Sequence, residues 1–248
     1  MPPIAGTCDP GDSQGMRPSA ADLSTERPSS PAPERSLGLV VVDDHPAVRR
    51  GLCALLDGEE DLHVLAAVGS TREGLAAIER LHPDVALLDF HLPDEDGLSI
   101  CLRTRRLARR PRVIVFSAFA DEALGLRATV AGAEGLVSKG GSPDELFAAI
   151  RAVTRGERWL PPLSAEVLQA QGAKLDPEDL PVVSMLRDRV PEEEIAETLR
   201  VELSWLRARR WAILGRLGAR GERRARPAQR TGSSAPFSST APPGPPAA

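Results

Sequence analysis

The chain has 248 residues, room for one or two domains, and carries 31 Lys and Arg against 35 Asp and Glu, a net charge of −4. This balance does not suggest a protein that coats nucleic acid. No apolar run approaches a membrane span, and the N-terminus lacks the basic and apolar regions of a signal peptide. Cys8, Cys53 and Cys101 lack metal-ligand spacing, so we expect reduced thiols in a cytoplasmic protein.

The two ends of the chain are rich in proline, glycine and serine. Such sequences cannot bury a hydrophobic core, so we expect disordered tails over residues 1–36 and 221–248. The folded part of the chain should therefore lie between them.

Five short apolar runs follow the first tail, at residues 37–42, 63–68, 84–89, 112–117 and 135–139. They are continuous rather than alternating, which is typical of strands buried on both faces of a parallel sheet. Helical patterns separate them, at residues 46–56, 71–81, 97–107 and 121–131. A fifth helix should begin with Ser142 as N-cap, Pro143 at N1 and Glu145 at N3, a capping box. The order predicts an α/β fold, a (βα)5 doubly wound parallel sheet.

Polar side chains stand at the carboxyl ends of four predicted strands, where such sheets bind ligands. They are Asp43 with Asp44, then Asp89, Ser117 and Lys139. Capping of the following helix is an alternative role, above all for Asp44, which precedes the helix at Pro46.

These side chains suit transfer of a phosphoryl group to a carboxylate. Close aspartates favour a hard divalent cation with retained waters, which indicates Mg²⁺. Asp89 is the candidate nucleophile, forming an acyl phosphate, while Ser117 hydrogen-bonds one phosphoryl oxygen. Lys139 is one of only two lysines in an arginine-rich chain, and its compact ammonium can pair with another oxygen as a point charge.

The stretches VVVDDHP, LLDFHLPDEDGL, VIVFSA and GLVSKG resemble the receiver domain of bacterial two-component response regulators, over about residues 37–156. The separations of 45, 28 and 22 residues that join Asp44, Asp89, Ser117 and Lys139 fit that family. The resemblance implies a flavodoxin-like fold and phosphorylation of Asp89 by a sensor histidine kinase. It also implies Mg²⁺ held by Asp44, Asp89 and the backbone carbonyl of His91, with Asp43 acting mostly through water.

One departure concerns the readout of phosphorylation. Receivers usually carry Tyr or Phe three residues before the lysine, and this side chain swings inward when the domain is phosphorylated. Here the position is Leu136, so the expected switch pair, Ser117 and Leu136, lacks a tyrosine hydroxyl. His91 lies where the family varies and tunes dephosphorylation, with a merely exposed histidine as the alternative.

Residues 157–174 read as a linker with one short helix, and residues 175–220 as three helical segments. The first should open with Asp176 as N-cap and Pro177 at N1, the second with Pro191, and the third should span about Glu202 to Leu217. LDPEDLPVVSML, EEEIAETLRV and ILGRLGAR resemble the small all-α helix-turn-helix domain of NarL/LuxR-type regulators, whose third helix enters the DNA major groove.

This second resemblance has departures too. Arg210 stands where an apolar core residue is expected, Trp205 and Trp211 are candidates for exposure, and RDRVPE replaces a loop that usually carries glycine. Residues 203–226 hold eight arginines and one acid, which suits phosphate contact. The DNA-contact candidates are Arg207, Arg209, Arg216 and Arg220, against a solvated arginine face as the alternative.

The leading interpretation is a transcriptional regulator, not an enzyme, switched by phosphorylation of Asp89 and partnered by a histidine kinase and promoter DNA. The alternative is a phosphorylation-dependent interaction protein whose degenerate C-terminal domain does not bind DNA. An aspartate-nucleophile phosphatase fits less well, because such enzymes carry an Asp-x-Asp pattern and Asp89 is followed by Phe90 and His91. Relatives also dimerise through receiver or DNA-binding surfaces, so a homodimer remains among the expected partners.

Overall fold

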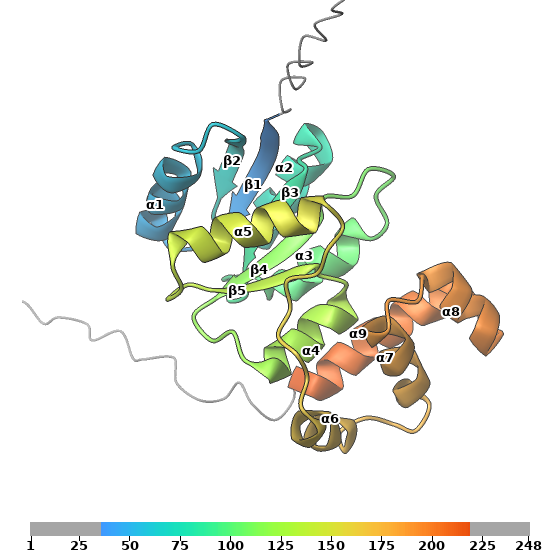
Figure 1. The fold of residues 1–248 in the computed structure, drawn as a ribbon. Helices are drawn as coiled ribbons and strands as arrows, with labels where there is room; N and C mark the ends of the chain where they lie inside the picture. Colours follow the sequence, from blue (N-terminus) through green and yellow to red (C-terminus); the bar gives the residue numbers. More distant parts are fainter. Residues whose placement is uncertain (1–35, 219–248) are drawn as a thin grey trace, which may run out of the picture. The chain divides into compact units, whose positions relative to one another are not determined.

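The computed structural model describes residues 36–218, so the two predicted tails lie outside it almost entirely. The described part contains one sheet of five parallel strands in the order β2-β1-β3-β4-β5. The strands are β1 (Leu37–Val42), β2 (Leu62–Val68), β3 (Val85–Asp89), β4 (Arg112–Ser117) and β5 (Gly135–Ser138). Every pairing is parallel, so the predicted (βα)5 sheet is confirmed (Figure 1).

The intervening helices are α1 (Pro46–Leu56), α2 (Thr71–Leu81), α3 (Gly97–Thr104), α4 (Glu122–Ala131) and α5 (Pro143–Thr154). Ser142 caps α5 as expected, because its hydroxyl accepts a hydrogen bond from the Glu145 amide. Helix α3 ends three residues before the predicted Leu107. There the amides of Arg106 and Leu107 bond to carbonyls only three residues back, at Arg103 and Thr104, which makes a tighter turn.

The helices cover both faces of the sheet. Residues of α1 and α5 pack on one face, in a cluster that includes Leu52, Leu56 and Ile150. Residues of α2, α3 and α4 pack on the other face, with Ile78, Ile100 and other buried side chains. Burial on both faces explains why the strands read as continuous apolar runs.

Four further helices follow: α6 (Ala165–Gly172), α7 (Asp179–Arg187), α8 (Glu192–Leu199) and α9 (Leu203–Gly218). Helix α6 is the short helix expected in the linker. The predicted start of α7 at Asp176 and Pro177 is wrong, because Asp176 to Glu178 form a turn before the helix. Buried Asp179 closes this turn by accepting a hydrogen bond from the Asp176 amide at 3.0 Å.

Helices α7–α9 share a hydrophobic cluster with the α2–α4 face of the sheet. Val182, Ile195, Leu206 and Ile213 belong to the same buried cluster as Leu126 of α4. The division into residues 37–156, 157–174 and 175–220 therefore remains a prediction, since the core continues across it. Within residues 36–218, no helix combines the length and hydrophobicity needed to cross a membrane.

Candidate functional site

The carboxyl ends of β1, β3, β4 and β5 bring the predicted polar residues to one edge of the sheet. The Nζ atom of Lys139 lies 2.7 Å from Oδ2 of Asp43 and 2.8 Å from Oδ2 of Asp89. Its backbone amide also donates to the Ser117 carbonyl at 2.8 Å, which fixes the residue beside β4. One ammonium thus joins two carboxylates that are 46 positions apart in the sequence.

Both of these carboxylates are almost fully buried, with 1% of the Asp43 and 4% of the Asp89 side chain exposed. Burial raises the pKa of Asp89, although the hydrogen bond from Lys139 opposes this effect. Burial alone would lower the pKa of Lys139, but its hydrogen bonds to Asp43 and Asp89 outweigh it and the pKa is raised. Lys139 is therefore held as a cation between two buried acids.

Asp44 and His45 lie at the mouth of the same cluster. Oxygen or nitrogen atoms of Asp43, Asp44, His45 and Asp89 all lie within 4.8 Å of one another. Three carboxylates at this separation offer the hard oxygen ligands that suit Mg²⁺. Asp44 does not have the capping role considered for it, because the N-cap of α1 is His45, whose amide donates to Oδ1 of Asp43 at 2.8 Å.

The imidazole of His45 was missed by the sequence reasoning. Its Nδ1 lies 2.5 Å from Oδ1 of Asp44 and 3.6 Å from Oδ1 of Asp43. The position of His45 directly after Asp43 and Asp44 could have indicated that it lies at this site. The other nearby histidine, His91, is exposed, and its amide donates to Oδ1 of Asp89 at 3.3 Å.

The two expected switch residues are buried. Ser117 has no exposed surface, and its hydroxyl accepts a hydrogen bond from the Phe119 amide at 3.2 Å. Leu136 is 5% exposed and belongs to the cluster that includes α4, and its amide donates to the Trp159 carbonyl at 2.7 Å. Phe119, by contrast, is 74% exposed beside the site.

Comparison with known proteins shows the family of the chain. Residues 39–151 match the model of the response regulator receiver domain. The transcriptional regulatory protein UhpA of Salmonella typhimurium is 33% identical over 73% of this chain and 91% of its own length. The chain belongs to the NarL/LuxR-type response regulators.

A second curated protein and a solved structure are also similar to this response regulator. DevR/DosR of Mycobacterium tuberculosis, a DNA-binding transcriptional activator, is 33% identical over 64% of this chain and 78% of its own. A structure of RcsB from Salmonella enterica serovar Typhimurium, bound to a promoter, covers 76% of this chain and 95% of its own. Its TM-score of 0.50 at 22% identity shows a shared fold.

Three of the four arginines that the sequence marked for DNA contact carry acidic partners in this response regulator. Arg209 reaches Asp179 at 2.6 Å, and Arg216 reaches Asp179 at 3.2 Å. Arg207 lies 3.5 Å from Glu192. The fourth candidate, Arg220, lies outside the described residues. The charges of α9 are thus balanced by acids of α7, α8 and the turn before α7.

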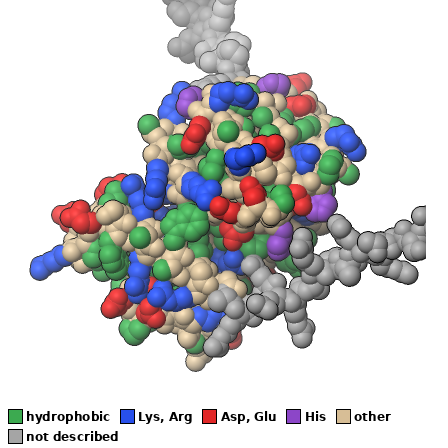
Figure 2. All heavy atoms as spheres, turned by 180° about the vertical axis from the view of Figure 1, so that it is seen from behind, with side chains coloured by type: hydrophobic (Ala, Val, Ile, Leu, Met, Phe, Trp, Pro, Cys, Tyr) green, Lys and Arg blue, Asp and Glu red, His purple; other side chains and the backbone are tan. Residues whose placement is uncertain are grey.

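The space-filling view shows the same balance. On the face in Figure 2, acidic and basic side chains are interspersed over helices α6–α9, and no single basic surface covers them. Trp205 and Trp211 are 38% and 40% exposed, as expected. The guanidinium of Arg209 lies 5.6 Å from the Trp205 ring.

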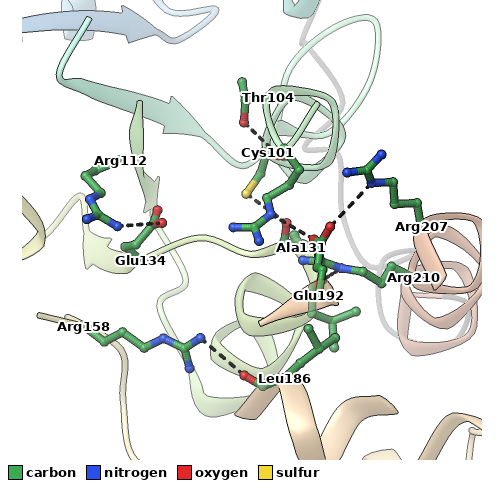
Figure 3. A network of polar contacts seen from close by, with 12 residues as sticks. Cys101, Thr104, Arg112, Ala131, Glu134, Arg158, Leu186, Glu192, Arg207 and Arg210 are labelled. Carbon is green, nitrogen blue, oxygen red and sulfur yellow. Dashed lines mark hydrogen bonds and ion pairs between the residues drawn. The ribbon is translucent and has the colours of Figure 1, made fainter. Parts of the chain in front are cut away.

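Arg210 occupies the core position that the sequence indicated, with 1% exposure. Its Nε donates to the Val130 carbonyl of α4 at 2.7 Å, and its Nη1 pairs with Glu192 of α8. Arg105, which follows α3, also donates to Glu192, at 3.0 Å. Figure 3 shows Arg210 and Arg207 of α9 converging on Glu192. This buried network joins α9 to both α8 and α4.

Proposed function

We propose that this response regulator accepts a phosphoryl group on Asp89 from a sensor histidine kinase and regulates transcription by binding DNA through its C-terminal helices. The observation that carries the proposal is Lys139, held between Asp43 and Asp89 at the edge where Ser117 also ends its strand. The protein then acts as a substrate of the kinase in the cytoplasm, and not as an enzyme.

Phosphoryl transfer at this site exchanges two bonds. The bond between phosphorus and the kinase imidazole breaks while a carboxylate oxygen of Asp89 bonds to phosphorus, and the imidazole recovers a proton from solvent. The Ser117 hydroxyl can donate to one phosphoryl oxygen. Lys139 can exchange its contact with Asp89 for a second phosphoryl oxygen while it keeps Asp43 as a partner. Most of the stabilisation is then electrostatic positioning.

Asp43, Asp44, Asp89 and the backbone carbonyl of His91 are the groups proposed to hold Mg²⁺. The cluster of three carboxylates supports this assignment, with Asp43 contributing through water. The ion would offset the negative charge of the carboxylates and the phosphoryl oxygens. The second proposed role of His91 is to tune the lifetime of the acyl phosphate.

Ser117 and Leu136 are the proposed switch, because both are buried and Leu136 packs in the cluster that contains α4. A shift of Leu136 would reach α9 through α4, whose Val130 carbonyl accepts from Arg210. Arg207, Arg209 and Arg216 are the proposed DNA contacts, with Arg220 as a flanking contact. Arg207, Arg209 and Arg216 can bind DNA phosphates only after their ion pairs with acids of the chain break. The switch would then control DNA binding by controlling these ion pairs.

The alternative is a phosphorylation-dependent interaction protein that does not bind DNA. Its support is the pairing of the α9 arginines with acids, together with the exposure of Trp205 and Trp211. Aromatic rings of this kind are common at protein interfaces. Under this alternative, phosphorylation of Asp89 is unchanged and only the output differs.

The chemistry at Asp89 can be tested without the kinase. Incubation with acetyl phosphate and Mg²⁺, followed by mass spectrometry of the intact protein, should show one added phosphoryl group. Asp89→Asn should show none, while Asp94→Asn, which changes an exposed acid on the following loop, should behave like the unmodified sequence. A wild-type protein that gains no phosphoryl group would contradict the proposal.

A further inference from the structure

A cavity of about 360 Å³ lies where the sheet meets the C-terminal helices. Its walls include Arg110 and Arg112 before and at the start of β4, Arg158 after α5, and Arg189 between α7 and α8. Because β4 starts at Arg112 and ends at Ser117, this cavity lies at the amino end of the sheet, opposite Asp89. It is thus separate from the proposed phosphorylation site.

The lining of this cavity is strongly basic. Seven of its 17 lining residues are arginines and three are glutamates. Of the glutamates, Glu192 already pairs with three arginines and Glu134 lies 3.6 Å from Arg112. Among the residues the structure describes, no carboxylate pairs with Arg110, Arg158 or Arg189. The cavity therefore holds a surplus of positive charge.

The environment of two arginines in the cavity wall, Arg210 and Arg158, is unfavourable for their charged guanidinium groups. Nη2 of Arg210 is buried and has no hydrogen-bond partner among the described residues, and it lies against Gly132 of the cavity wall. Burial lowers the pKa of Arg210 to about 10. Burial also lowers the pKa of Arg158, and the nearby charge of Arg189 adds to the effect. A buried donor without a partner is costly, and the negative charge of an anion in the cavity would offset the positive charge of Arg210.

Arg189 is held in an unfavourable backbone conformation. Its φ of 67° lies in the left-handed region, which costs a non-glycine residue about 1 kcal/mol or more. The side chain of Arg189 lines the cavity, so the strained residue adds one guanidinium group to the cavity wall.

We propose that this cavity binds the oligophosphate group of a small molecule. Guanidinium groups bind phosphate oxygens through paired hydrogen bonds, and several of them match several linked phosphates better than a single anion. The volume is that of a small-molecule site and has no room for a nucleic-acid duplex. Because the walls come from the receiver and from α7–α9, the ligand would stabilise the arrangement in which these helices pack on α4.

Calorimetric titration of the full chain with inorganic tripolyphosphate tests this proposal. A buffer without divalent ions keeps the phosphates away from the acidic cluster at Asp89. At physiological salt we expect saturable binding with one site per chain, and Asp89→Asn should bind equally well. Absence of saturable binding, or its loss in Asp89→Asn, would overturn the proposal.

Two variants locate the site. Arg110→Gln removes an exposed cavity arginine, and Arg189→Gly removes another while relieving its backbone strain. Each should weaken binding roughly three- to tenfold, as expected for one hydrogen bond from an arginine that stays partly exposed to water. Arg80→Gln, which removes an exposed arginine of α2 outside the cavity, should leave affinity unchanged. Equal weakening in Arg80→Gln would mean diffuse attraction and would also overturn the proposal.

Titration with nucleoside triphosphates tests whether the ligand is a nucleotide or an oligophosphate without a nucleoside. Tighter binding of ATP or GTP than of tripolyphosphate would support the proposal and assign a nucleotide. Equal binding would support it with recognition of the phosphates alone. The result is independent of phosphorylation at Asp89, so failure of one proposal leaves the other standing.

Discussion

At the scale of single residues, the rare use of lysine in this chain indicated that Lys139 belongs to the site. The chain uses arginine for almost every positive charge, yet a lysine lies between two buried carboxylates at the carboxyl edge of the sheet. A planar guanidinium would not fit as a point charge between two acids and a phosphoryl oxygen. The residue therefore has a structural role before phosphorylation and a proposed chemical role during it.

We expect Lys139→Met to destabilise the protein at pH 7 by about 2 kcal/mol, because Asp43 and Asp89 lose their shared cation and repel each other. Urea denaturation followed by circular dichroism measures the change, and added Mg²⁺ should restore part of it. Lys174→Met is the matched control, since the ammonium of Lys174 donates to the Gln171 side chain at 2.8 Å and pairs with no carboxylate of the described residues. Equal losses in the two variants would contradict the structural role of Lys139.

Glu192 is the second residue on which the structure depends. It is 4% exposed and pairs with Arg105, Arg207 and Arg210. We expect Glu192→Gln to cost roughly 3–5 kcal/mol, because it leaves Arg210 buried without its charged partner. Glu194→Gln, in the same helix but exposed, should change stability little. The double variant Glu192→Gln/Arg210→Met should cost less than the sum of its parts in urea denaturation.

The same pair makes stability depend on pH. Burial alone would raise the pKa of Glu192, but the charges of Arg210 and Arg105 outweigh it, so the pKa is lowered on folding. The contribution is then fully present above the ordinary glutamate pKa of about 4.3 and is lost as pH falls through the folded value. We expect the stability difference between wild type and Glu192→Gln to shrink over this acidic range. A constant difference would contradict the assignment.

At the scale of elements, the sequence predicted the strands and most helices of the receiver closely. Helices α1 and α2 have the predicted bounds, because Pro46 and Ser70 mark their starts and apolar residues follow at helical spacing. The start of α7 was missed because Asp179, which accepts from the Asp176 amide in the turn before the helix, is also paired with Arg209 and Arg216 of α9, and Asp-Pro spacing does not reveal such a tertiary contact. The partners of Arg207, Arg209 and Arg216 were missed for the same reason: they come from other helices.

The contact between α4 and the linker gives a test at this scale. A Cβ at Gly125 would lie 2.7 Å from Cγ of Pro161, whose ring cannot move aside alone. We expect Gly125→Ala to destabilise the protein by roughly 1–3 kcal/mol through overpacking. Gly215→Ala is the control in α9, where a Cβ meets nothing within 4 Å, and it should stabilise by up to about 1 kcal/mol. Thermal unfolding of both variants measures the effects, and no loss in Gly125→Ala would refute this contact.

At the scale of the whole molecule, the C-terminal helices are packed as part of the receiver's core and not as a free module. The cluster that spans Leu126 and Ile213, and the bond from Arg210 to Val130, connect α4 to α9 directly. Arg207, Arg209 and Arg216, which are proposed for DNA contact, meanwhile pair with acids of the same chain. DNA binding by this form should therefore be weak, and phosphorylation of Asp89 should have to loosen these contacts to strengthen it.

The most direct test is the affinity for promoter DNA, measured by fluorescence anisotropy over a range of salt concentrations with fragments recovered by genome-wide capture. We predict that acetyl phosphate and Mg²⁺ strengthen binding by the wild-type protein, that affinity falls steeply as salt rises, and that Asp89→Asn shows no gain. Failure of the phosphorylated protein to bind DNA even at low salt would contradict transcriptional control through DNA and favour the interaction-protein alternative.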